Sequence, residues 1–153
     1  MKVALVHEWL INFAGSEKVL KTLSEIYPDA PIYVPVYNAQ KVPQLKNKKI
    51  YTSFLQKFPK VLSKPQIYLP LMLRAFESFD FSSYDLVISS SHAFAKGIKT
   101  PSRTLHICYC HYPLRYVWEP EVDPRLSTNP IYRLIKILLK KPDLRASKRP
   151  DYY

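Results

Sequence analysis

Short apolar runs separated by polar or amphipathic segments are the feature that most restricts how this chain can fold. The runs are rich in aliphatic, β-branched or aromatic residues, which is typical of strands buried on both faces of a parallel sheet. Pro35 predicts that the second run lies at a sheet edge or ends there. The strand candidates are Val3–Val6, Pro31–Tyr37, Lys49–Thr52, Leu86–Ser89 and Thr104–Cys110.

Helical patterns lie between these runs. Apolar residues recur at helical spacing from Val19 to Tyr27, and a proline ends that helix. Further helices are expected at Tyr68–Phe79 and Pro130–Lys141, with Pro142 breaking or kinking the last one. Gly97 is expected to cap a short helical turn in a left-handed conformation. The alternation of strands and helices predicts an α/β protein with a Rossmann-like parallel sheet and helices on both faces.

Histidines stand at the ends of three predicted strands. His7, His92 and His111 each follow such a run, directly or after a few residues. The carboxyl ends of strands in open α/β sheets form the crevice where ligands bind. An imidazole there can hydrogen-bond a sugar or a phosphate, or move a proton near neutral pH. We therefore expect a site at this edge, with His111 as the candidate catalytic residue. A histidine that only bonds the local backbone is the alternative.

Other polar residues are expected to join this edge. Glu8 and Ser91 lie next to the strand-end histidines, and both are candidate contacts to an acceptor or a sugar, as are His7 and His92 themselves. Arg115 adds a cation close to His111, suited to a phosphate oxygen.

The segment Ala14-Gly15-Ser16 joins the first strand to the first helix. Free backbone N–H groups and the positive end of a helix dipole suit such a joint to a phosphate. Ser16 is also a good N-cap residue, so the segment could equally serve only to begin the helix. A nicotinamide site is disfavoured, because its fingerprint needs three spaced glycines and the whole chain has two.

Charge and composition restrict the partners. The formal net charge is +11 at pH 7, which favours nucleic acid, anionic lipid or a phosphorylated substrate. The basic residues of 131–141 lie largely away from its apolar stripe, as on a solvated face or on a helix that contacts an anionic membrane.

Cys108 and Cys110 share one face of a strand, so we expect buried, reduced thiols and no metal site. No segment has the roughly 18 apolar residues of a membrane span. We expect a cytoplasmic protein whose membrane contact is at most peripheral, on the inner face of the cell membrane.

Several segments, taken together and in order, resemble the N-terminal domain of family 4 glycosyltransferases, which have the GT-B architecture. The resemblance is closest to bacterial mannosyltransferases and related sugar transferases of polysaccharide biosynthesis, and it covers nearly the whole chain. Where the family usually has two adjacent glycines in the first loop, this chain has Ala14-Gly15. The segments that carry the resemblance are 3–10, 15–19, 84–93, 95–97 and 108–116.

The resemblance implies one half of a larger enzyme. Residues 1–153 would form the N-terminal, acceptor-side domain, and the C-terminal, donor-binding domain would be absent. The loop Ala14-Gly15-Ser16 would approach the donor diphosphate, and His111 would reach the transferred sugar. The intact enzyme would be a retaining hexosyltransferase that moves a sugar, with mannose as one candidate, from a nucleotide-sugar to a glycan or lipid-linked acceptor. It would need no metal or other cofactor, and this fragment alone would be inactive.

Other functions remain open at this point. A noncatalytic module could use the basic faces to bind anionic lipid or nucleic acid, although no nucleic-acid motif is present and no such partner is expected. A related GT-B enzyme, such as a sugar-nucleotide epimerase, would use carboxylates from a second domain. A serine hydrolase is disfavoured, because Ser89–Ser91 lacks the flanking glycines of a nucleophile elbow. Finally, 149–153 is expected to be a turn that enters a new strand.

Overall fold

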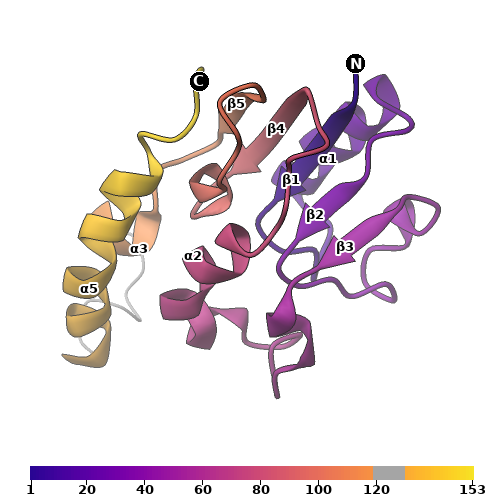
Figure 1. The fold of residues 1–153 in the computed structure, drawn as a ribbon. Helices are drawn as coiled ribbons and strands as arrows, with labels where there is room; N and C mark the ends of the chain where they lie inside the picture. The colour runs from indigo at the N-terminus through magenta and orange to yellow at the C-terminus, as the bar shows by residue number, and fades with distance from the viewer. Residues whose placement is uncertain (119–129) are drawn as a thin grey trace.

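The fold is built on a parallel β-sheet with helices on both faces (Figure 1). The computed structural model describes residues 1–118 and 130–153, with the backbone alone described at 115–116 and 130–136. Within these residues the sheet has five strands in the order β3-β2-β1-β4-β5, all parallel. The α/β sheet predicted from the sequence is confirmed. The strands are β1 (Val3–His7), β2 (Ile32–Val34), β3 (Ile50–Thr52), β4 (Leu86–Ser91) and β5 (Leu105–Cys110).

Helices pack on each face of the sheet. α1 (Gly15–Ile26) covers one face, whereas α2 (Leu69–Glu77) and α5 (Pro130–Ala146) lie on the other. The short α3 (Arg115–Trp118) contacts α5. Short 3-10 turns complete the connections, namely η1 (Pro43–Leu45), η2 (Phe54–Lys57), η3 (Pro65–Tyr68) and η4 (Ala95–Gly97).

Strand alternation divides the core between the two faces. Successive side chains of a strand point to opposite sides of the sheet. Leu5 and Ile88 therefore belong to a core with Leu20 of α1. Val6 belongs to the second core, together with Phe76 of α2. Full burial of such a side chain stabilises the fold by about 1.5–3 kcal/mol.

The direction in which strands are added to the sheet reverses between β1 and β4. From β1 the chain continues to β2 and β3 on one side, then crosses to β4 and β5 on the other. Such a reversal leaves a crevice at the carboxyl ends of the two central strands. The register places His7, the last residue of β1, opposite Ser90 of β4.

The structure bears on three sequence expectations about local structure. β2 ends before Pro35 and lies between β1 and β3, so the proline marks a strand end rather than a sheet edge. Gly97 does not adopt a positive φ, so the predicted left-handed cap is wrong. Instead, a Cβ atom on Gly97 would lie 2.5 Å from Cδ1 of Leu73 and 3.0 Å from Cβ of Ala146, so close packing requires this glycine. α5 continues through Pro142 to Ala146.

The end of the chain lies beside β5. Tyr152 forms a parallel bridge with Ile107, as expected for a segment that enters a new strand.

Cys108 is buried but Cys110 is exposed, so the expectation of two buried thiols is only half right, although both are free. The bridge at Ile107 does not extend to Cys110. Among the described residues, no helix combines the length and the apolar character needed to cross a membrane.

Candidate functional site

Two imidazoles and a hydroxyl form a hydrogen-bonded chain at the carboxyl edge of the three strands β1, β4 and β5. Oγ of Ser90 lies 3.0 Å from Nδ1 of His7 and 2.8 Å from Nε2 of His111. His111 directly follows β5, and its backbone N–H donates to the carbonyl of Ser91 at 2.8 Å. His7 and Ser90 are fully buried and His111 is half-buried. The chain therefore leads from the core to the surface at the reversal of strand order.

Glu17 lies at the inner end of this chain. Its Oε1 atom is 3.5 Å from Nε2 of His7, a long contact between two buried groups. Its Oε2 atom accepts a hydrogen bond from the N–H of Ala14 at 2.9 Å. Burial raises the pKa of the Glu17 carboxyl, but the interaction with His7 and the backbone N–H groups of Glu17 and Ala14 lower it to about 2. Glu17 is therefore a buried carboxylate at neutral pH.

Glu8 holds the loop that follows β4. Its Oε1 atom accepts hydrogen bonds from Oγ of Ser91 at 2.9 Å and from the backbone N–H groups of His92 at 3.2 Å, Ala93 at 2.7 Å and Ala95 at 2.8 Å. Glu8 and Ser91 are both buried. Their predicted contact with an acceptor stays a prediction, and in this structure both side chains serve the protein's own loop.

His92 sits beside the chain rather than in it. Its ring packs edge-on against the rings of Trp9 and His7, with centroids 5.4 and 6.1 Å apart. Burial lowers the pKa of His92, and the neighbouring His7 lowers it further, while Glu8 and Glu17 partly oppose this. His92 is therefore an uncharged aromatic wall of the site near neutral pH.

His111 is placed to meet a ligand as a neutral group. Burial lowers its pKa, and the neighbouring His7 and His92 lower it further, with Glu17 and Glu8 acting in the opposite direction. A neutral imidazole has one donor nitrogen and one acceptor nitrogen. Since Nε2 contacts Ser90, the Nδ1 atom is the one left for a ligand.

The loop before α1 is open to solvent. Ala14 is the N-cap residue, so Ser16 does not cap the helix as its residue type suggests. A Cβ atom added to Gly15 would meet nothing within 4 Å. The first N–H groups of a helix have no partner inside it. The loop can therefore accept an anionic group close to its backbone.

A buried ion pair fixes α5 near the same edge. Nζ of Lys96 lies 2.8 Å from Oδ1 of Asp143, and Oδ2 of Asp143 accepts a hydrogen bond from Nε1 of Trp118 at 2.8 Å. These three residues line a cavity of about 440 Å³ together with Cys110 and Tyr153. Arg115, predicted to add a cation here, lies outside the residues whose side chains are described.

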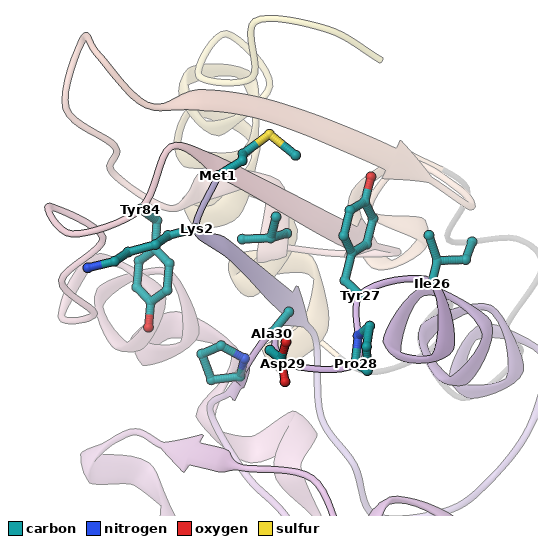
Figure 2. A pocket seen from close by; sticks show the side chains of 10 residues that line it. Met1, Lys2, Ile26, Tyr27, Pro28, Asp29, Ala30 and Tyr84 are labelled. Carbon is teal, nitrogen blue, oxygen red and sulfur yellow. The ribbon is translucent and has the colours of Figure 1, made fainter.

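Another pocket lies at the opposite edge of the sheet. It has a volume of about 390 Å³ and is formed by the start of the chain, the end of α1 and Tyr84. Figure 2 shows Met1 and Lys2 around it, with Tyr27 from the end of α1 and Asp29 from the turn that follows. None of the predicted site residues lines this pocket. Among the described residues, no cluster of three or more His, Cys, Asp or Glu side chains could hold a metal ion.

The structure thus brings together His7, His92 and His111, and adds Ser90 and Glu17. Nothing in the sequence singles out Ser90 among three adjacent serines, because its role depends on the register of β1 with β4. Glu17 has a weak signal, since an acidic residue in the first turn of a helix often bonds the backbone before it. Comparison with known protein families, with curated proteins and with solved structures gave no match for this chain.

Proposed function

We propose that this chain is the acceptor-side domain of a glycosyltransferase that moves a sugar from a nucleotide-sugar donor to a glycan or lipid-linked acceptor. The observation that carries the proposal is the hydrogen-bonded chain of His7, Ser90 and His111 at the reversal of strand order. This is the position where open α/β sheets bind their ligands. The family resemblance of the strand-end segments supports the same reading.

The chemistry of the edge suits a sugar. A half-buried, neutral His111 offers a hydrogen bond to a hydroxyl group without placing a charge beside it. Trp9 and His92 add aromatic surface next to the chain. His111 would bind and orient the transferred sugar, and the carboxylates of Glu8 and Glu17 would stay engaged with the protein.

The loop before α1 would receive the donor diphosphate. Gly15 is exposed and has open space where a side chain would lie. The positive end of the α1 dipole favours the charge that develops on the leaving diphosphate. Further cations and the nucleotide pocket would come from a second domain, so this chain alone should bind the donor weakly and transfer no sugar.

Calorimetric titration with a nucleotide-sugar tests this proposal. We expect weak binding by the unchanged chain and at least a tenfold loss in the His111→Ala variant. Lys2→Ala, at the opposite edge of the sheet, is the control and should leave the affinity unchanged. Equal affinities for the unchanged chain and His111→Ala would contradict the proposed site, and so would sugar transfer by the chain alone.

A second candidate function is binding to an anionic membrane surface. α5 exposes the large apolar side chains of Ile137, Leu138 and Leu144. Lys140 and Lys141 are exposed among them. An exposed apolar stripe flanked by cations is the pattern of helices that lie in the interface of anionic bilayers. This surface would bring the domain to a lipid-linked acceptor on the inner face of the cell membrane, or act alone in a noncatalytic module.

Vesicle sedimentation tests whether α5 contacts an anionic membrane. We expect the chain to bind phosphatidylglycerol vesicles more strongly than neutral phosphatidylcholine vesicles, and less strongly as salt is raised. The double variant Ile137→Ser, Leu144→Ser should weaken this binding severalfold. Ile26→Ser, an equally exposed isoleucine on α1, is the control. Binding that does not change in the double variant would contradict a role for α5.

A further inference from the structure

The hydrogen bonds that link His7, Ser90 and His111 can run in either of two donor-to-acceptor directions. Ser90 has one hydroxyl proton, so Oγ can donate to one imidazole and must accept from the other. In one arrangement Ser90 donates a hydrogen bond to His7 and accepts one from His111. In the other it accepts from His7 and donates to His111. The two arrangements place the proton of His111 on different nitrogen atoms, and so present opposite groups to a ligand.

Glu17 favours one arrangement. Its carboxylate lies 3.5 Å from Nε2 of His7, and both side chains are buried. A lone pair on Nε2 would face this negative charge with no water to separate them, so Nε2 carries the proton. Where His7 holds a single ring proton, Nδ1 is then the acceptor, and Oγ of Ser90 donates a hydrogen bond to it across 3.0 Å. Oγ of Ser90 consequently accepts from Nε2 of His111 across 2.8 Å.

We propose that Glu17 is a positioning residue that sets the tautomer of His111 through His7 and Ser90. In this arrangement Nε2 of His111 carries the proton and Nδ1 is an acceptor. The ligand group that meets His111 must then donate a hydrogen bond, which a hydroxyl does and a phosphate oxygen does not. The tautomer follows from the geometry, whereas the assignment of that hydroxyl to a sugar rests on the proposed function.

Within the described part of the protein, Glu17 is the only carboxylate in contact with His7, Ser90 or His111. Glu8, the other buried acid nearby, directs Oε1 to the loop after β4. His92 faces His7 edge-on, and Tyr109 lies beside His111 with ring centroids 4.9 Å apart. Among the described residues, Nδ1 of His111 has no hydrogen bond that would fix the opposite tautomer.

Nitrogen NMR of the chain with ¹⁵N-labelled histidine tests the proposal without any ligand. The chemical shifts of Nδ1 and Nε2 report which ring nitrogen carries the proton. At a pH at which the His7 shifts show a single ring proton, we expect His111 of the unchanged chain to be protonated on Nε2. In Glu17→Gln the amide oxygen can still accept from Ala14, while the amide N–H₂ donates to Nε2 of His7. The donor-to-acceptor direction of the hydrogen bonds among His7, Ser90 and His111 then reverses, and the chemical shifts of the two His111 nitrogens are exchanged.

Two further variants make the test decisive. Glu25→Gln, on the exposed side of the same helix, should leave the shifts of His111 unchanged. Ser90→Ala removes the hydroxyl that links His7 to His111. Both tautomers of His111 should then be populated, and their ratio should no longer respond to Glu17→Gln. If Glu17→Gln does not fold, Ser90→Ala alone still has to change the His111 shifts. Protonation of His111 on Nδ1 in the unchanged chain would overturn the proposal, and so would identical shifts in every variant. Loss of donor binding with the tautomer intact would count against the proposed function only.

Discussion

His7 and Ser90 face each other across β1 and β4, with Nδ1 of the histidine 3.0 Å from Oγ of the serine. The contact joins residues from distant parts of the sequence at the central strand pair of the sheet. A slip of one residue in this register would turn either side chain to the opposite face. The candidate site therefore depends on the packing that fixes β1 against β4, in which Leu5 and Ile88 take part.

Replacement of Glu8 by alanine should destabilise the fold strongly. The carboxylate accepts a side-chain and three backbone hydrogen bonds at the end of β4, and all of these donors would lose their partner in a buried place. Each buried donor left without a partner costs about 1–3 kcal/mol, so we expect a loss of about 3–5 kcal/mol in the free energy of unfolding, measured by urea denaturation. Glu25→Ala, in an exposed ion pair, should change it by less than about 0.5 kcal/mol. Similar values for the two variants would show that the Glu8 contacts do not hold the loop.

The two glycines should respond in opposite ways to alanine. Gly97→Ala places a methyl group against Leu73 and Ala146, so we expect a loss of about 1–3 kcal/mol in unfolding free energy. Gly15→Ala meets open space and should leave the stability unchanged or slightly raised. The same Gly15 variant should nevertheless weaken nucleotide-sugar binding if the loop approaches the diphosphate. Thermal unfolding of both variants tests this. If Gly97→Ala is as stable as the unchanged chain, Gly97 is not needed for close packing.

The edge that carries the site could be predicted from the sequence because strand ends are local features. Apolar runs that stop at a histidine mark His7 and His111, and the alternation of strands and helices implies that parallel strands end at one edge. The contacts between these side chains could not be predicted in the same way. Ser90 is selected by strand register, and Glu8 turns inward because the loop after β4 offers backbone donors.

Helix boundaries and close packing account for the remaining differences. The sequence favours Ser16 as the N-cap, but the N-cap of α1 is Ala14, two residues earlier, which places Glu17 where it reaches the N–H of Ala14. Gly97 looks like a left-handed cap, yet its need for space arises from Leu73 and Ala146, which are distant in sequence.

Acid should destabilise the protein through His106. Burial lowers the pKa of His106 from 6.5 to about 4, while the nearby Asp151 opposes this. The unfolded chain takes up this proton near pH 6.5 and the folded chain only near pH 4, so the folded state loses stability as the pH falls between these values. The total is about 3 kcal/mol. His106→Gln can keep the hydrogen bond to Ser89 and should remove this part of the pH dependence of unfolding. An unchanged dependence in that variant would exclude His106 as its source.

The two cysteines should differ sharply in reactivity. Burial raises the pKa of the Cys108 thiol to about 11, whereas Cys110 is exposed at the end of β5. Because the thiolate is the reactive form, iodoacetamide near pH 8 should modify Cys110 and spare Cys108. Mass spectrometry of the native chain would show one adduct, and Cys110→Ser would show none on the same timescale. Equal labelling of both residues would contradict the burial of Cys108.

Mapping nucleotide-sugar binding by amide and histidine NMR on this chain is the most direct test of the proposed sugar site. We expect shift changes at residues 14–16 and at His111, with Nδ1 of His111 responding more than Nε2. Residues of the pocket at the opposite edge, such as Asp29, should not change. Changes confined to that pocket or to α5, or no change at saturating ligand, would contradict a sugar-binding site at the carboxyl edge of the sheet.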